Sequence, residues 1–156
     1  MFRVSRRLDY GLQLMIALAS EEGKQAKSTA SIAQDLQIPL PFLHQIAHTL
    51  MQTGLIKARP GPRGGLYLNK PVKEITLLQI VEVLEGPVTL NPYPADDPEG
   101  HARPEKSTAQ FFWNDMQQKI VLHLESICLE QLANFPEYTA WTALLESNIS
   151  SPSPKV

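Results

Sequence analysis

The sequence of 156 residues predicts a mainly α-helical fold with one small β-hairpin. Three observations lead to this prediction. Helical patterns cover residues 28–36 and 40–53, the turn-forming run Gln37-Ile38-Pro39 separates them, and strand-like runs at 55–58 and 66–68 flank a Pro- and Gly-rich turn. Two short helices across a tight turn, followed by a hairpin, are typical of a winged helix-turn-helix head. A long apolar helix nearer the C-terminus, suited to dimerisation, completes the predicted architecture.

The charge of the chain is divided unevenly between its two halves. Residues 1–73 carry ten Lys and Arg against four Asp and Glu, a net charge of +6, whereas residues 74–156 carry four against twelve, a net charge of −8. A basic half is typical of a head that binds nucleic acid, joined here to an acidic body. No apolar run approaches the roughly 20 residues of a membrane span, and no signal-peptide pattern follows the N-terminus, so we expect a cytoplasmic protein.

The first predicted helix, residues 5–19, begins with an unfavourable charge arrangement. Ser5 is a natural N-cap, and Arg6 and Arg7 follow in the first turn. The helix dipole disfavours a cation there by about 0.3–1 kcal/mol. A DNA phosphate would turn the arrangement into a binding site, because free N–H groups and two guanidinium groups would meet one anion. The alternative is a plain pair of solvated surface charges.

The predicted helix at 40–53 has one apolar face and one polar face without charge. At 100° per residue, the apolar face consists of Leu43, Ile46, Ala47 and Leu50. The opposite face consists of Pro41, His44, Gln45, His48 and Gln52, with Phe42 and Thr49 flanking it. Glutamine pairs bidentately with adenine and histidine donates to base acceptors or phosphate, so this face suits the DNA major groove. The alternative is an ordinary solvated face, which usually mixes Glu and Lys.

The same helix offers a weak argument for an enzyme. His44 and His48 lie four residues apart on one face, as in the zinc-protease pattern, but Gln45 stands where that pattern needs a glutamate base. We therefore expect no enzymatic activity.

The predicted hairpin has a basic tip. Gly54 ends the preceding helix, and the run Arg59-Pro60-Gly61-Pro62-Arg63-Gly64-Gly65 connects the strands, with both arginines expected to project from the tip. A basic tip beside a recognition helix suits the minor groove or the DNA backbone. The Walker and dinucleotide-binding patterns are absent, which argues against a nucleotide cradle. The expected DNA-binding residues are Arg6, Arg7, Ser28, Pro41, Phe42, His44, Gln45, His48, Thr49, Arg59, Arg63 and Gly64.

The C-terminal half is predicted to contain helices around a proline-rich segment. Thr76 to Gln79 forms a capping box for a helix that ends at Glu85 and buries Leu77, Ile80, Val81 and Leu84. A second capping box, Ser107 to Gln110, begins a helix of some 18 to 25 residues that is too apolar to remain uncovered, which predicts a dimer. The expected dimerisation residues are Phe112, Trp113, Met116, Ile120, Leu124 and Ile127.

These patterns divide the chain into four parts. Residues 1–86 form the DNA-binding head, and residues 87–106 form a Pro-rich acidic loop. Residues 107–146 hold the dimerisation helix and short C-terminal helices, the last of them around Tyr138 and Trp141, and residues 147–156 form a disordered tail.

Several segments in register also resemble a known family. They are Leu8-Asp9-Tyr10, Ile32-Ala33, Leu36, Ile38-Pro39, Phe42-Leu43, Gly54-Leu55-Ile56, Gly61-Pro62, Gly64-Gly65, Ile75-Thr76-Leu77, Val83-Leu84-Glu85-Gly86 and Trp113-Asn114-Asp115. Over roughly residues 1–136 the chain resembles the iron–sulfur cluster regulator (IscR-type) family of winged-helix transcription factors, which includes nitric-oxide sensors and cysteine-metabolism repressors. The resemblance implies a homodimer that reads an inverted repeat with recognition helices and wings. It also implies long helices that cross to form the dimer, and a break in that helix near Cys128.

The chain departs from this family pattern at its ligand positions. Cluster-binding members carry three cysteines in the segment that corresponds to Pro87–Ser107, which here contains no cysteine and has His101 as its strongest candidate ligand. Asp9 stands where one branch uses a carboxylate ligand, but fits a favourable early-helix charge, and Cys128 fits a buried small apolar residue. Biological clusters are held mainly by thiolates, so we expect neither an iron–sulfur cluster nor another cofactor. In the wing, Pro60 replaces the family's arginine, which leaves open whether Arg59 or Arg63 enters the minor groove.

The sequence therefore predicts a cytoplasmic, homodimeric, sequence-specific transcriptional regulator, a repressor, whose partners are duplex DNA and a second copy of itself. A regulatory protein or small molecule is a further expected partner. The alternative is a protein-interaction or small-molecule sensing module of the same fold with little intrinsic DNA binding.

Overall fold

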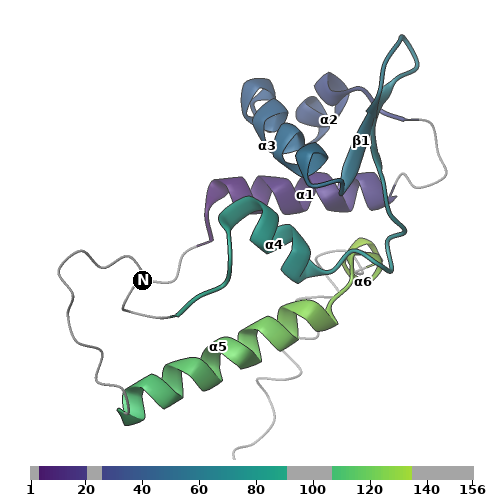
Figure 1. Ribbon diagram of the computed structural model, residues 1–156. Helices are drawn as coiled ribbons and strands as arrows, with labels where there is room; N and C mark the ends of the chain where they lie inside the picture. Colours follow the sequence, from purple (N-terminus) through teal and green to yellow (C-terminus); the bar gives the residue numbers. More distant parts are fainter. Residues whose placement is uncertain (1–3, 21–25, 91–106, 135–156) are drawn as a thin grey trace, which may run out of the picture.

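The computed structural model describes residues 4–20, 26–90 and 107–134. Six helices and two strands occur in these ranges (Figure 1). They are α1 (Arg6–Ser20), α2 (Thr29–Asp35), α3 (Leu40–Gln52), β1 (Ile56–Arg59), β2 (Gly65–Leu68), α4 (Leu77–Glu85), α5 (Thr108–Ser126) and α6 (Leu129–Ala133). The mainly helical winged architecture predicted from the sequence is confirmed. The expected loop at 91–106, the helix around Tyr138 and Trp141, and the tail at 147–156 lie outside the described residues.

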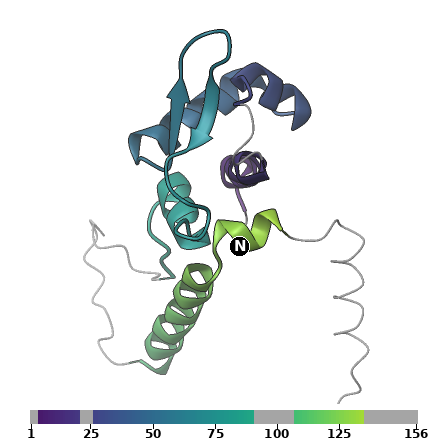
Figure 2. The ribbon, with the colours of Figure 1, turned by 90° about the vertical axis from the view of Figure 1, so that its right-hand side faces the viewer.

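The elements are arranged around α1. Helices α2 and α3 and the hairpin lie on one side of α1, whereas α5 lies on the other side, beyond α4, in both views (Figures 1 and 2). The strands are antiparallel, and Ile56 pairs with Leu68 and Arg59 with Gly65. Helix α3 and the hairpin are therefore at the end of the molecule opposite the long helix α5. None of the helices in the described ranges is both long and apolar enough to cross a bilayer.

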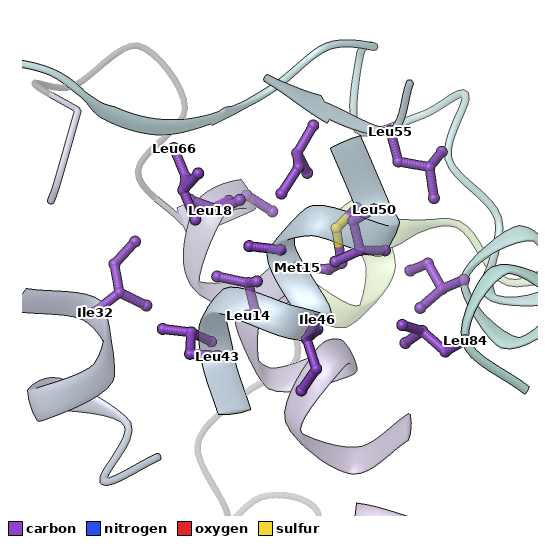
Figure 3. Close-up of a cluster of buried hydrophobic side chains, with 14 of the residues drawn as sticks. Leu14, Met15, Leu18, Ile32, Leu43, Ile46, Leu50, Leu55, Leu66 and Leu84 are labelled. Atoms are coloured by element: carbon purple, nitrogen blue, oxygen red, sulfur yellow. The ribbon is translucent and has the colours of Figure 1, made fainter. Parts of the chain in front are cut away.

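A single apolar core joins these elements (Figure 3). Leu14 and Met15 of α1 and Leu43 and Leu50 of α3 are all 0% exposed. Leu129 of α6 is also 0% exposed and belongs to the same core. Because burial of a Leu or Met side chain contributes about 1.5–3 kcal/mol, this cluster fixes α3 and α6 against α1.

The cap of α4 follows the prediction, whereas that of α5 follows it only in part. Gln79 N donates to Thr76 Oγ1 over 3.2 Å, and Thr76 N donates to Gln79 Oε1 over 3.4 Å, which completes the capping box. At α5, Ser107 Oγ accepts from Gln110 N over 3.1 Å, but the Gln110 side chain donates to Asn114 rather than back to the cap. The second predicted capping box is therefore half formed.

Burial along α4 is narrower than the sequence predicted. Ile80 and Leu84 are buried, whereas Leu77 and Val81 are half-buried. The expectation that all four are buried is wrong for these two residues, because α4 packs against α1, α3 and α5 without being enclosed by them.

The predicted break in the long helix lies between α5 and α6. Helix α5 ends at Ser126, and Cys128 is the N-cap residue of α6, with its N–H donating to Gln131 Oε1 over 2.9 Å. Cys128 is half-buried rather than buried, which corrects the prediction for that side chain. The reason is its cap position, where it forms an isolated antiparallel bridge with Thr76 at the edge of the core.

The turn between α2 and α3 contains a strained residue, which gives a stability prediction. Gln37 has a φ of +55°, a left-handed conformation that costs a non-glycine residue about 1–2 kcal/mol. Its side chain is exposed, so Gln37→Gly removes little packing and is expected to raise the free energy of unfolding by about 0.5–1 kcal/mol in urea titrations. The matched control Gln34→Gly, in α2, should lower it by about 0.5–1 kcal/mol. A destabilised Gln37→Gly would contradict the prediction.

Candidate nucleic-acid interface

The polar face of α3 is accessible over its whole length. Its residues Pro41, His44, Gln45, His48 and Gln52 are exposed. The opposite face is closed, because Leu43, Ile46, Ala47 and Leu50 are at most 2% exposed. The two faces therefore divide as the sequence predicted. The exposed one presents amide and imidazole groups, which can pair with base edges, and no carboxylate that would repel phosphate.

The flank of α3 is fixed to α1 by two contacts. In the first contact, Arg7 Nη2 of α1 donates to Thr49 Oγ1 of α3 over 3.0 Å. Within α3, Thr49 Oγ1 in turn donates to the Gln45 carbonyl over 3.1 Å. Phe42 packs edge-on against Tyr10 with the ring centroids 5.7 Å apart, and Phe42 remains 37% exposed. The first turns of α1 therefore hold α3 in position.

The N-terminus of α1 has partners within the protein. Ser5 Oγ accepts from Leu8 N over 3.0 Å and donates to Glu85 Oε1 at the end of α4. The Glu85 carboxylate supplies negative charge where the helix dipole favours it, and Arg7 contacts Thr49. The charge conflict noted in the sequence is therefore eased without a phosphate, and phosphate binding by Arg6 and Arg7 stays a prediction.

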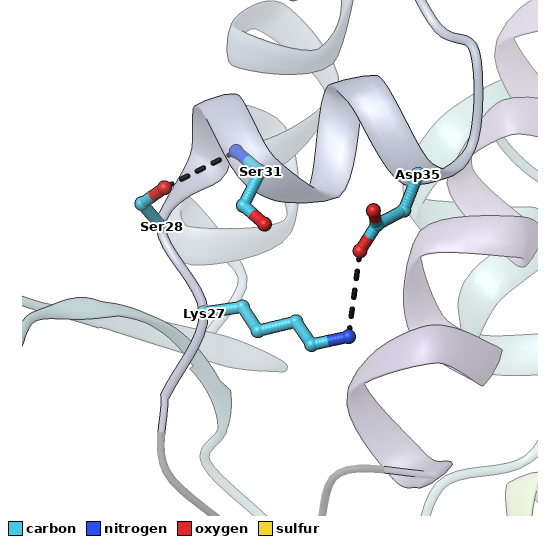
Figure 4. A network of polar contacts seen from close by, with 4 residues as sticks. All are labelled: Lys27, Ser28, Ser31 and Asp35. Carbon is cyan, nitrogen blue, oxygen red and sulfur yellow. Dashed lines mark hydrogen bonds and ion pairs between the residues drawn. The ribbon is translucent and has the colours of Figure 1, made fainter.

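Helix α2 begins at a side-chain cap beside the hairpin. Ser28 Oγ accepts from Ser31 N over 3.1 Å, and Lys27 Nζ lies 3.4 Å from Asp35 Oδ2 (Figure 4). Both side chains of this ion pair are about half exposed, so it contributes little to stability. Ser28 is exposed and near the start of the helix-turn-helix, as its predicted role requires.

The structure separates the two arginines of the hairpin. Gly64 N donates to the Gly61 carbonyl over 2.9 Å, which closes a turn with Pro62 and Arg63 at its centre. Arg63 is therefore at the tip. Arg59 is the last residue of β1, and its guanidinium carbon lies 5.6 Å from the centre of the Tyr67 ring. The expectation that both arginines project from the tip is wrong for Arg59, because strand pairing continues as far as that residue.

Two glycines allow the hairpin to close. A Cβ atom at Gly64 would lie 2.0 Å from the Arg59 carbonyl oxygen, and one at Gly65 would lie 1.9 Å from the Lys27 carbonyl oxygen. The Lys27 carbonyl also accepts from Leu66 N, so the segment before α2 pairs with β2. Packing of the hairpin therefore requires a glycine at position 64, independently of the DNA contact predicted for Gly64.

The two weak metal candidates within the described residues, Asp9 and Cys128, belong to no metal-binding cluster. Asp9 Oδ2 accepts from Gln13 Nε2 over 2.8 Å at the start of α1, Cys128 caps α6, and His101 lies outside the described residues. In the part of the chain that the structure describes, no three His, Cys, Asp or Glu side chains gather as metal ligands would.

The long helix has a large apolar surface that no other described element of the chain covers. Phe111 is 67% exposed, Phe112 50% and Leu122 64%, and Phe112 packs edge-on against Trp113. Of the predicted dimerisation residues, Phe112 and Trp113 are exposed, whereas Met116, Ile120, Leu124 and Ile127 are half-buried.

A helix-turn-helix with a basic hairpin beside its recognition helix defines the class of winged-helix DNA-binding regulators. The family profile of Rrf2, described as "Iron-dependent Transcriptional regulator", matches residues 4–134. The chain belongs to the Rrf2 family, and the predicted resemblance to IscR-type regulators is confirmed.

Named relatives are similar over most of their length. The regulator CymR of Bacillus subtilis is 32% identical over 135 residues, which are 86% of this chain and 92% of CymR. IscR of Photorhabdus laumondii is 30% identical over 124 residues, 80% of this chain and 73% of that protein. The solved structure of B. subtilis CymR, described as the global cysteine regulator, superposes with a TM-score of 0.76 at 31% identity and covers 88% of this chain and all of that one. The T. potens IscR structure superposes with a TM-score of 0.68 at 27% identity and covers 90% of this chain and 96% of that one.

The donor set of this chain does not fit a thiolate-held iron–sulfur cluster, although the family description mentions iron. Such clusters are bound mainly by several cysteines, and the whole sequence has one, Cys128, at the N-cap position of α6.

Sequence reasoning missed three features of this interface. They are the contact between Arg7 and Thr49, the bond between Ser5 and Glu85, and the position of Arg59 over Tyr67. The third was missed because the predicted strand ended at Ala58, whereas β1 extends to Arg59 and so puts Arg59 on the same face as Lys57.

Proposed function

We propose that this chain is a cytoplasmic homodimeric repressor that reads an inverted repeat in duplex DNA with α3 and the wing, without an iron–sulfur cluster. The observation that carries the proposal is the exposed, charge-free polar face of α3 opposite a fully buried one. The family assignment supports DNA as the partner.

The dimer is supported by the surface of α5. Exposed apolar patches mark interaction sites, and Phe111, Phe112 and Leu122 are at least half exposed on a helix remote from the DNA-reading surface. A second copy packed on this surface would bury these side chains and place two recognition helices on one duplex. Twofold symmetry of the protein then requires an inverted repeat.

The test is a titration with a duplex from the region upstream of the chain's own gene, at several salt concentrations. Because Lys and Arg contacts to phosphate release counterions, about six such contacts predict a fall in affinity of roughly 10³-fold between 50 and 200 mM salt. We expect two chains per duplex and a preference over an unrelated duplex of equal length. Absent or salt-insensitive binding would instead support a protein-interaction or small-molecule sensing module.

A further inference from the structure

The hairpin has an outer face that neither the recognition helix nor the wing tip includes. In the strand register, Lys57 pairs with Tyr67, so these two side chains and Arg59 share one face. The neighbouring residues Ile56 and Leu66 are 1% and 4% exposed and point into the core. The face formed by Lys57, Arg59 and Tyr67, called here the outer wing face, is therefore directed away from the protein body.

The charges on the outer wing face have no acidic partner in the described part of the chain. Lys57 and Arg59 are exposed, and no described carboxylate forms an ion pair with either. The Arg59 guanidinium lies instead over the Tyr67 ring, 5.6 Å from its centre. A cation over an aromatic ring gains about 0.5–1 kcal/mol at an exposed site, which restricts the arginine to a position along the strand.

We propose that the outer wing face binds the DNA sugar–phosphate backbone while Arg63 at the wing tip enters the adjacent groove, and that Tyr67 is a positioning residue for Arg59. A guanidinium held in one orientation can bind a phosphate bidentately with less loss of side-chain freedom. The Cα atoms of Lys57 and Arg59 are about 6.8 Å apart along the same strand, so this face presents two cations to the backbone phosphates. The inference rests on the proposed function.

The experiment measures the salt dependence of affinity for the upstream duplex and for an unrelated duplex. Affinity falls with salt, so the slope of log K against log salt is negative. We expect Arg59→Ala to make this slope shallower by about 0.9, the value for one phosphate contact. Tyr67→Val, which keeps a strand-forming residue, should weaken binding several-fold, and Tyr67→Phe, which keeps the ring, should bind as the wild type does. All three variants should retain the wild-type preference for one duplex over the other, because phosphate contacts do not read sequence.

A double-mutant cycle separates positioning from a merely structural role. If Tyr67 acts through Arg59, adding Tyr67→Val to Arg59→Ala causes no further loss of affinity. Additive losses, or a Tyr67→Val protein that binds as tightly as the wild type, would overturn the inference while leaving the proposed function intact. If Tyr67→Val does not fold, Arg59→Lys keeps the charge but not the planar group, and unchanged binding by that variant would overturn the inference. A wild-type chain that fails to bind either duplex would overturn both proposals.

Discussion

Gln45→Glu is expected to reduce the affinity for the specific duplex by about 100-fold or more. Gln45 is exposed near the middle of the polar face of α3. Loss of one bidentate base contact costs about 1–3 kcal/mol, or roughly 5- to 150-fold. The new carboxylate adds electrostatic repulsion from the DNA phosphates that flank the groove. The measurement is fluorescence anisotropy with a labelled upstream duplex at fixed salt.

Two controls separate this loss from unfolding and from net charge. Gln45→Glu should melt at the wild-type temperature, because the Gln45 group that Thr49 uses is the backbone carbonyl, which the substitution keeps. Gln131→Glu adds the same charge to an exposed position of α6, on the side of α1 opposite α3, and keeps the oxygen that accepts from Cys128 N, so this variant should bind DNA nearly as the wild type does. Equal losses for both variants would mean that net charge, rather than the face of α3, governs binding. Unchanged binding by Gln45→Glu would contradict its assignment to the reading surface.

The sequence predicted what depends on local periodicity and capping. The two faces of α3 follow from apolar residues at helical spacing, and the α4 cap follows from Thr76 and Gln79 three residues apart. The hairpin follows from the glycines and prolines between two short strands. Each of these signals lies within one element or one turn, so a single sequence is sufficient to detect it.

Contacts between distant elements could not be predicted in the same way. Ser5 and Glu85 are 80 residues apart, and Arg7 and Thr49 are 42 apart, and no spacing rule connects such positions. The position of Arg59 was missed because its strand extends one residue further than predicted, which moves the side chain from the tip to the face of the hairpin. Two of these contacts orient Arg7 and Arg59, so the class of candidate site was predictable from the sequence and the orientation of its arginines was not.

Leu129→Ala is expected to lower the free energy of unfolding by about 2–5 kcal/mol, the cost of truncating a fully buried leucine. Leu129 is 0% exposed in the common core, and α6 packs against α1. Its N–H donates to the Ile75 carbonyl over 2.8 Å, and Leu77 N donates to the Ile127 carbonyl over 2.8 Å. The measurement is urea unfolding. Leu40→Ala, at a leucine that is 37% exposed, should cost about 1 kcal/mol or less.

The same substitution tests how the head is joined to the dimerisation helix. Helix α6 and the bridge between Thr76 and Cys128 connect the end of α5 to the start of α4, so they set the angle between the head and the proposed dimer axis. Loosening this connection should let the two heads move independently. Leu129→Ala, measured below its unfolding transition, should therefore lose more affinity for an inverted repeat than for a duplex with one half-site. Equal losses on both duplexes would show that α6 stabilises the head without fixing its orientation.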